Sequence, residues 1–241
     1  MLLDIKLEAE AQFVQLTRLK KYLIIEEEEY NYETYEEKAT GWSRHPTEFI
    51  DEERVNLEET LSAVGEINIF TDGSKMEQGV GSAFCVFGQQ QELIAEWQGR
   101  LSPKNSIFQA ELIALQEAVK YAQNHQKQVK IWSNSESSLK ALLNKKSNSP
   151  IARSIQDYLY NTHNIRLGWI RDHVGHLGSD KADELANEAI TSKKAAVLTV
   201  PLQRSSAKQD LKQRARAKWQ SRWDDGINGR STYEIIKKAE L

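Results

Sequence analysis

The hydrophobic and polar positions of this chain follow two different periods, which predict where helices and strands lie. Along residues 1–25, apolar side chains recur every three or four positions, as on one face of an amphipathic helix. From residue 67 the period changes to two, with Ile67, Ile69 and Thr71 alternating against other side chains. This alternation predicts a strand that ends at Asp72, after which Gly73 and Ser74 turn the chain away.

Two more strand segments, residues 79–87 and 92–97, follow at short intervals, which predicts an antiparallel meander. Ser106 and Gln109 then have the spacing of a capping box at the start of a helix. The next strand segment, residues 129–133, is reached through that helix. It is therefore expected to run parallel to its neighbour in the sheet.

The same periods continue to residue 192. They predict a short helix over 135–143, a helix over 150–163 capped by Ser149, and a strand over 165–170. Ser179 is expected to open a last helix. The prediction is an α/β fold with a five-stranded mixed sheet, in which three strands form the meander and the last two run parallel to the first. Helices flank the sheet, and helical extensions precede and follow it.

Changes in composition suggest three consecutive segments. Residues 1–65 form a helical and acidic connection, in which glutamates from residue 26 to 37 are interpreted as a solvated linker. Residues 66–192 form the α/β domain, and residues 193–241 form a basic amphipathic helical extension. We predict that this last helix is capped by Ser206 and Gln209.

The C-terminal extension carries an apolar stripe at four-residue intervals, formed by Leu211, Ala215, Trp219 and Trp223. Lysine and arginine residues surround that stripe. Two interpretations remain open. The basic residues are either a solvated face over a docked helix or a surface that contacts nucleic acid.

The overall composition narrows the classes of protein. The 241 residues carry a net charge of −3, which argues against a chain that is basic throughout and binds nucleic acid by charge alone. Cys85 is the single cysteine, so disulfide frameworks and cysteine-rich zinc sites are excluded. No apolar run approaches about 18 residues, and the start lacks a signal-peptide layout. An intracellular protein of the cytoplasm or nucleus, without membrane segments, is expected.

Candidate acidic residues gather around the first strand of the predicted domain. Asp72 lies at the end of that strand, and Asn134 follows the strand expected to run parallel to it. Neighbouring strands lie about 4.8 Å apart, so the two side chains should share one site. Glu111 lies early in a helix, where it could also simply complement the helix dipole. Asp183 lies in the last helix of the domain.

Four motifs in this order resemble those of the RNase H (type 1) domains of non-LTR, or LINE-type, retrotransposon polyproteins. They are TDGS at 71–74, QAEL at 109–112, IWSNSESSL at 131–139 and WIRDHVGHLGSDKADELAN at 169–187. The resemblance covers roughly residues 66–192. The flanking segments resemble the same polyproteins more loosely, which implies a reverse transcriptase domain in the parent polyprotein or a gene derived from one.

The resemblance implies a hydrolase, an endoribonuclease that cleaves the RNA strand of RNA–DNA hybrids. It implies two Mg²⁺ ions, for which Mn²⁺ can substitute, because two cations held by carboxylates can activate water and stabilise the leaving oxygen. The implied metal ligands and catalytic residues are Asp72, Glu111, Asn134 and Asp183, with His173 assisting proton transfer or product release. The implied substrate-binding residues are Gly73, Ser74, Gln109 and Glu136.

The chain departs from the family pattern at three positions. Asn134 stands where the family has a catalytic aspartate, Glu136 where it commonly has glutamine, and Asp172 where glycine is usual. Asn134 has three readings: an engineered substitution, decay in an old element, or a domain kept without catalysis. The alternative function is therefore a non-catalytic RNase H-like module that binds nucleic acid or serves a structural role. An integrase-like or exonuclease relative fits the His173 loop and the last helix less well.

Overall fold

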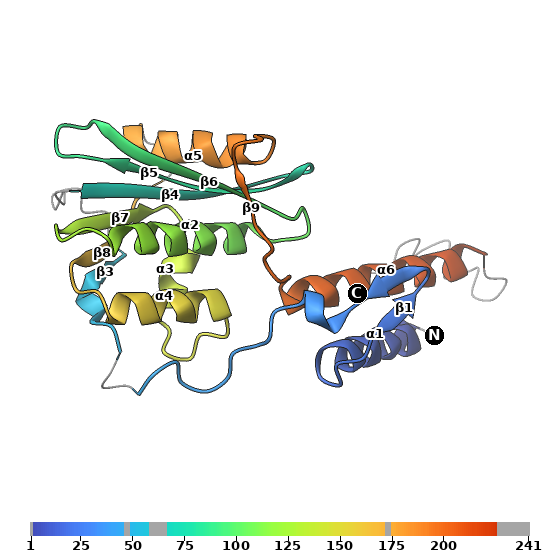
Figure 1. The fold of residues 1–241 in the computed structure, drawn as a ribbon. Helices are drawn as coiled ribbons and strands as arrows, with labels where there is room; N and C mark the ends of the chain where they lie inside the picture. The colour runs from blue at the N-terminus through green and yellow to red at the C-terminus, as the bar shows by residue number, and fades with distance from the viewer. Residues whose placement is uncertain (1, 46–48, 58–66, 172–174, 226–241) are drawn as a thin grey trace. The chain divides into compact units, whose positions relative to one another are not determined.

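A computed structural model describes residues 2–45, 49–57, 67–171 and 175–225. The chain forms two compact units, each of which is described by itself. Residues 37–200 form the sheet unit, and residues 1–36 together with 201–241 form the terminal unit (Figure 1). None of the helices in the described ranges is both long enough and apolar enough to span a bilayer.

The sheet unit is built on a mixed sheet in the order β3-β8-β7-β4-β5-β6-β9. Strands β4, β5 and β6 form the antiparallel meander, and β7 and β8 run parallel to β4. The predicted five-stranded sheet is confirmed, with two short parallel strands added at its edges. The strands are β3 (Val55–Asn56), β4 (Ile67–Met76), β5 (Gly79–Phe87), β6 (Leu93–Leu101), β7 (Val129–Ser133), β8 (Ile165–Trp169) and β9 (Ala196–Val197).

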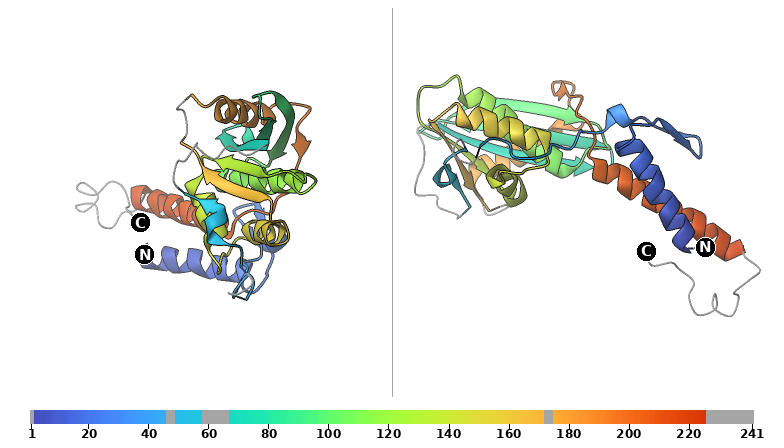
Figure 2. Two further views of the ribbon diagram at one scale, coloured as in Figure 1. Left: turned by 90° about the vertical axis from the view of Figure 1, so that its left-hand side faces the viewer. Right: turned by 90° about the horizontal axis from the view of Figure 1, so that it is seen from below.

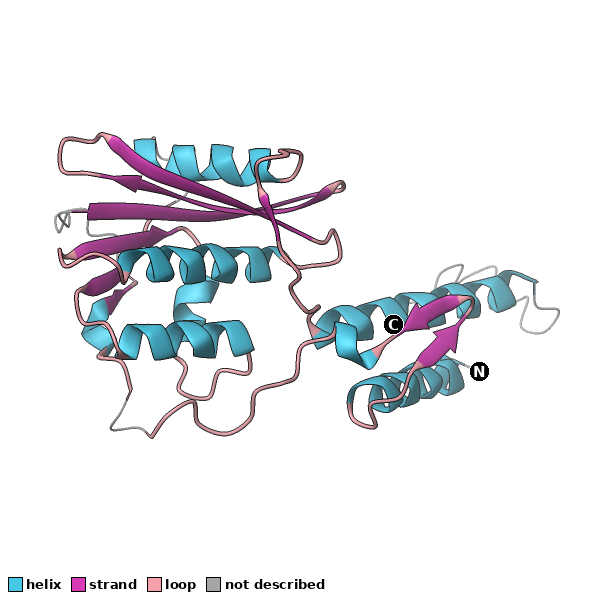
Figure 3. Ribbon diagram, viewed as in Figure 1, coloured by secondary structure: helices cyan, strands magenta, loops and turns pink. Residues whose placement is uncertain are grey.

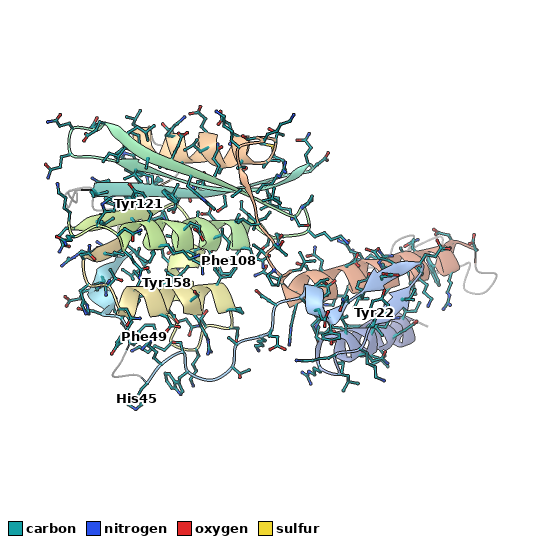
Figure 4. All side chains as sticks on the ribbon, in the orientation of Figure 1. Tyr22, His45, Phe49, Phe108, Tyr121 and Tyr158 are labelled. Carbon is teal, nitrogen blue, oxygen red and sulfur yellow. The ribbon has the colours of Figure 1, made fainter. Side chains whose placement is uncertain are left out.

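Helices cover both faces of this sheet. On one face lie α2 (Ile107–Ala122), α3 (Glu136–Leu143) and α4 (Pro150–Tyr160), and on the other lies α5 (Leu177–Ala189) (Figures 1 and 2). The larger core fills the side of α2 and α4. Phe108 and Tyr121 on α2 and Tyr158 on α4 pack at its margin (Figure 4). A smaller cluster of mainly alanine and phenylalanine side chains lies beneath α5.

Strand β4 continues past Asp72 to Met76, so the prediction that it ends at Asp72 was wrong. Its parallel pairing with β7 does stop there, at Thr71 and Ser133. Its antiparallel pairing with β5 continues to the last residue of the strand, where Met76 lies opposite Gly79. That second ladder satisfies the backbone of residues 73–76 and keeps the chain extended.

Three other element ends also differ from the predictions. Strand β6 extends to Leu101 because it pairs with β5 up to Val80. Helix α4 ends at Tyr160, three residues before the predicted end. Helix α5 begins at Leu177 with His176 at its N-cap, so Ser179 lies inside the first turn instead of opening the helix.

Two arginines connect the segment before β3 to α4 within the sheet unit, at Gly41 and at Arg54. Arg54 donates hydrogen bonds to the carbonyls of Leu159 at 2.9 Å and Ile165 at 3.1 Å. Arg153 donates to the carbonyl of Gly41 at 2.7 Å. The hydrogen bonds of Arg54 satisfy carbonyls in the last turn of α4 and at the start of β8, next to β3 at the edge of the sheet.

In its described residues, the terminal unit contains α1 (Leu2–Thr17), α6 (Arg204–Asp225), a small hairpin and a short 3₁₀ helix (Tyr32–Thr34) (Figure 3). Helix α1 packs against α6. The prediction of one helix through residue 25 was wrong, because β1 (Leu23–Ile25) and β2 (Glu28–Tyr30) form a hairpin after α1. Its turn uses Glu26 and Glu27 at φ of 50° and 69°, the left-handed conformation that tight hairpin turns need. Part of the expected solvated acidic linker is therefore ordered.

The apolar stripe of α6 is docked within the terminal unit, as expected if the basic residues form the solvated face of a docked helix. Ala207, Leu211 and Trp219 are buried, and Ala215 is partly buried. The capping box expected at Ser206 and Gln209 does not form, because α6 begins earlier, at Arg204. The division expected at residues 65 and 193 also differs from the observed one, since the two ends of the chain form one unit and β3 and β9 belong to the sheet unit.

Candidate active site

Asp72 and Asn134 meet where β7 ends beside β4. Thr71 and Ser133 are the last parallel pair, so each side chain follows directly from that pair on its own strand. Asn134 Nδ2 donates a hydrogen bond to Asp72 Oδ1 at 3.1 Å. Asp72 is 6 % exposed, so this contact lies in a largely water-excluded place. The sheet register thus brings together the two positions as the sequence predicted.

Asn134 presents its side-chain oxygen to the same place. The Trp169 indole N–H donates to the backbone carbonyl of Asn134 at 3.2 Å, which anchors the residue after β7. Asn134 Oδ1 is buried and accepts no hydrogen bond from the described part of the chain. Buried polar atoms without a hydrogen bond are rare, and they often mark a place where a ligand or ion binds. The geometry therefore leaves one neutral oxygen donor beside Asp72.

Glu111 is brought to β4 by close packing between that strand and α2. A Cβ on Gly73 would lie 2.7 Å from the backbone nitrogen of Glu111 and 3.0 Å from Ala110. No other residue fits this approach without displacing the helix, so Gly73 fixes how near Glu111 comes to the strand. Glu111 itself is buried. The structure thus gives Gly73 a packing role that the sequence did not reveal.

The start of α2 is fixed by the predicted capping box. Ser106 Oγ accepts a hydrogen bond from the Gln109 backbone N–H at 3.2 Å, and Gln109 Oε1 accepts one from the Ser106 N–H at 3.3 Å. Gln109 Oε1 also accepts a hydrogen bond from Asn105 at 3.0 Å, and its side chain is 1 % exposed. The side chain expected to bind substrate is therefore enclosed in the cap, where it holds the helix that carries Glu111.

Asp183 is positioned from α5 through a residue that the sequence analysis did not single out. Asn187 Nδ2 donates to Asp183 Oδ1 at 2.9 Å. The Ser74 hydroxyl donates to Asn187 Oδ1, so β4 and α5 are joined through this amide. The four-residue spacing of Asp183 and Asn187 places both on one face of the helix, and this was the signal that could have indicated Asn187.

Among the remaining predicted site residues, Glu136 lies within the described part of the chain. Glu136 opens α3 and forms an ion pair with Lys140 at 2.8 Å, with about half of its side chain exposed. His173 and Asp172 lie outside the described residues. Gly175, with a φ of 81°, has the backbone conformation that favours glycine in the loop before α5.

A metal site cannot be assigned from carboxylates alone. Within the described residues, no three side chains of His, Cys, Asp or Glu are grouped so as to hold a metal ion. Asn134 takes one of the positions that the sequence analysis expected to be a ligand. The structure therefore shows Asp72 and Asn134 in direct contact, with Glu111 on α2 and Asp183 on α5, two helices that pack against β4.

The family of the chain follows from comparison with known proteins. The RNase H family model matches residues 65–191, just over half of the chain. The chain belongs to the RNase H family. The RNase H resemblance and the predicted RNase H-like fold are thereby confirmed, and the matched range differs by one residue at each end from the predicted domain.

Two curated relatives of this RNase H domain share a short segment with it. Ribonuclease H of Francisella tularensis subsp. novicida is 56% identical over 34 residues, which cover 14% of this chain and 22% of that protein. Ribonuclease H of Francisella philomiragia is 50% identical over 34 residues. The matched segment spans about a fifth of the length of these relatives.

Two solved structures are also similar to part of the chain. The foamy viral protease-reverse transcriptase in complex with dsDNA has a TM-score of 0.47 and 20% identity, over 53% of this chain and 95% of that one. The same protein in complex with RNA/DNA hybrid has a TM-score of 0.48 and 19% identity, over 56% of this chain and 22% of that one.

Proposed function

We propose that this RNase H domain is a divalent-metal-dependent endoribonuclease that hydrolyses the RNA strand of RNA–DNA hybrids, with its activity weakened by Asn134. Membership of the RNase H family supports the reaction class. The observation that carries the proposal is the contact between Asp72 and Asn134, beside which a buried side-chain oxygen lacks a hydrogen bond. An oxygen donor in that position is what a hard cation requires.

The candidate ligands are of the chemical type that Mg²⁺ prefers, but together they carry little negative charge. Mg²⁺ prefers oxygen ligands, and all the candidate donors are oxygens, from Asp72, Glu111, Asp183 and Asn134. A pair of bound ions, Mg²⁺ or Mn²⁺, would supply an activated water and stabilise the charge that develops on the leaving oxygen. Because Asn134 is neutral, the set carries one negative charge fewer than four carboxylates would. We therefore expect weaker metal binding than in a domain with aspartate at this position.

We assign separate roles to the protein residues of the site. Asp72 lies at the centre, because it contacts Asn134 and precedes the glycine that packs on α2. Asn187 holds Asp183 in a fixed orientation. We assign His173 to proton transfer or product release. Discrimination for RNA would come from contacts to its 2′-hydroxyl groups, which DNA lacks.

One observation favours a second candidate, a non-catalytic module that binds nucleic acid or serves a structural role. The Asn134 amide donates to Asp72 and so stabilises that buried carboxylate without any metal. An aspartate in the same place would repel Asp72 instead. The substitution thus suits a domain that keeps its fold after losing its chemistry.

We also infer that the domain derives from a LINE-type retrotransposon polyprotein that included a reverse transcriptase. The four motifs quoted above and the tryptophan-containing C-terminal segment support this origin.

The decisive experiment measures cleavage of a labelled RNA–DNA hybrid as a function of Mg²⁺ concentration. We expect Asp72→Asn to abolish cleavage, and Asn134→Asp to raise it by about tenfold or more, because loss of even an indirect metal contact costs about 10- to 100-fold. Asn124→Asp, the same charge change at the exposed end of α2, is the matched control and should leave the rate unchanged.

Equal rates for the wild-type chain and Asn134→Asp would contradict a metal-binding role for residue 134. If neither protein cleaves but both bind the hybrid, the non-catalytic candidate is correct.

A further inference from the structure

The row of lysine and arginine residues on α6 is only partly neutralised within the terminal unit. The buried row of the helix contains Ala207, Leu211 and Trp219. Basic residues flank this row on both sides, and the two flanks differ in their partners. This difference shows which cations remain available to bind something else.

On one flank the charges are paired. Arg214 forms ion pairs with Glu28 of the hairpin and with Asp210, and Lys218 forms one with Glu8 of α1 at 3.1 Å. Glu28 and Glu8 come from the hairpin and from α1, and Asp210 lies on α6 itself, four residues before Arg214. This flank therefore contributes to docking of the helix and offers little net positive charge.

On the other flank α1 and α6 border a groove of about 260 Å³. Among the described residues that line it, Lys6, Lys208, Lys212 and Arg216 are cationic and Glu10 is acidic. Arg216 already interacts with another group. Glu10 pairs with Lys208 at 3.0 Å, in an exposed ion pair. Neither Lys6 nor Lys212 forms an ion pair with any residue that the structure describes, and both are exposed.

We propose that this groove binds the sugar–phosphate backbone of a nucleic acid, through Lys6, Lys208 and Lys212 with Arg216 at its end. Residues 208, 212 and 216 recur every four positions, which spaces them by about 6 Å and spans about 12 Å along the helix. That length matches roughly three to four phosphates of one strand of a duplex. A regular row of cations suits a polymer with regularly spaced negative charges.

Two features of the terminal unit argue against other anionic partners. A membrane-binding helix needs an exposed apolar face, but the apolar row of α6 is buried in the terminal unit. An acidic protein segment would have irregular charges and would usually bring apolar anchors, for which the described lining of the groove offers only Ala9 and Ala215. The proposal does not depend on catalysis in the sheet unit.

The test is binding of a fluorescent RNA–DNA hybrid of about 20 base pairs to the full chain in EDTA, measured by anisotropy over a range of salt concentrations. We expect Lys6→Glu combined with Lys212→Glu to weaken binding roughly tenfold, and to reduce the slope of log affinity against log salt by about two. Lys6→Gln with Lys212→Gln should give a smaller loss in the same direction. It guards against misfolding of the charge-reversed chain.

The control is Lys21→Glu combined with Lys193→Glu, which makes the same charge change at two exposed lysines outside the groove. An equal loss in the control would show a general charge effect and overturn the proposal. Displacement of the hybrid by polyglutamate at equal charge concentration would instead identify an acidic-protein site. Because EDTA removes divalent metal, hybrid binding is measured without cleavage, and the outcome is readable even if the proposed nuclease activity fails.

Discussion

Asn187 joins two residues of the candidate site that lie on different elements, and its role can be tested directly. It donates to Asp183 on its own helix and accepts from Ser74 on β4. Replacing it with alanine should leave Asp183 free to rotate, so we expect Asn187→Ala to weaken metal binding by about 10- to 100-fold. Mn²⁺ binding measured by electron paramagnetic resonance checks this without relying on turnover.

The matched control is Asn161→Ala, which removes an amide that bonds a backbone carbonyl at the end of α4. It should leave Mn²⁺ affinity unchanged. If Asn187→Ala binds Mn²⁺ as tightly as the wild-type chain, then Asn187 only connects β4 to α5 and does not position a metal ligand.

At the scale of single residues, the sequence could predict which positions meet but not which way each one faces. Parallel pairing of two strands was enough to bring Asp72 and Asn134 together. Gly73 and Ser74 were expected to approach substrate, but Gly73 faces the backbone of α2 and the Ser74 hydroxyl bonds to Asn187. Those orientations depend on which helix covers each face of β4, and no local pattern contains that information.

At the scale of elements, periodicity predicted where helices and strands lie, and tertiary contacts decided where they end. The strand predicted over residues 79–87 matches β5 at both ends, because β4 pairs along its whole length and β6 pairs with it from Val80 to Phe87. Helix α1 ends at Thr17, although suitable apolar spacing continues beyond it. There the chain instead forms a hairpin whose Tyr30 is buried against α1 and α6, and that gain is not local.

Glu36 lies where the chain between the hairpin and the sheet unit pairs with the segment before α6, and it predicts a pH dependence of the terminal unit. Its backbone N–H donates to the carbonyl of Leu202 at 2.8 Å. Burial raises the pKa of Glu36 to about 7, and the nearby Arg204 only partly offsets this effect. The folded state therefore holds a proton on Glu36 that the unfolded chain releases near its ordinary pKa of 4.5.

Proton binding by Glu36 therefore adds to the free energy of unfolding. This contribution is fully present below about pH 4.5 and is lost as pH rises through about 7. We expect Glu36→Gln to remove this loss, and so to stabilise the terminal unit at pH 8 more than at pH 5. The measurement is urea unfolding of both proteins at the two pH values, with hydrogen exchange of the α6 amides as the probe of the terminal unit. Equal effects at the two pH values would contradict a raised pKa for Glu36.

At the scale of the whole molecule, the pairing of the two chain ends could not be predicted from the sequence. In the sequence, all the residues of the sheet unit lie between residues 1–36 and residues 201–225. Each of these two ends has the pattern of an amphipathic helix. Such a pattern shows that a face is buried but not what buries it. The structure identifies the partner through Ala9, Leu16 and Leu211, which share one apolar cluster.

This arrangement predicts unequal consequences for two truncations. A chain of residues 1–200 lacks α6, so the apolar face of α1 loses its cover, and a 16-residue helix alone is marginal in water. A chain of residues 37–200 lacks both ends of the terminal unit but keeps every strand from β3 to β9.

We expect α1 amides to exchange roughly a hundredfold faster in the first truncation than in the full chain. Amides of β4 and α2 should stay protected in both truncations. Loss of protection in β4 and α2 within the 37–200 chain would show that the sheet unit needs the terminal unit to fold, and hydrogen–deuterium exchange with mass spectrometry distinguishes the two outcomes.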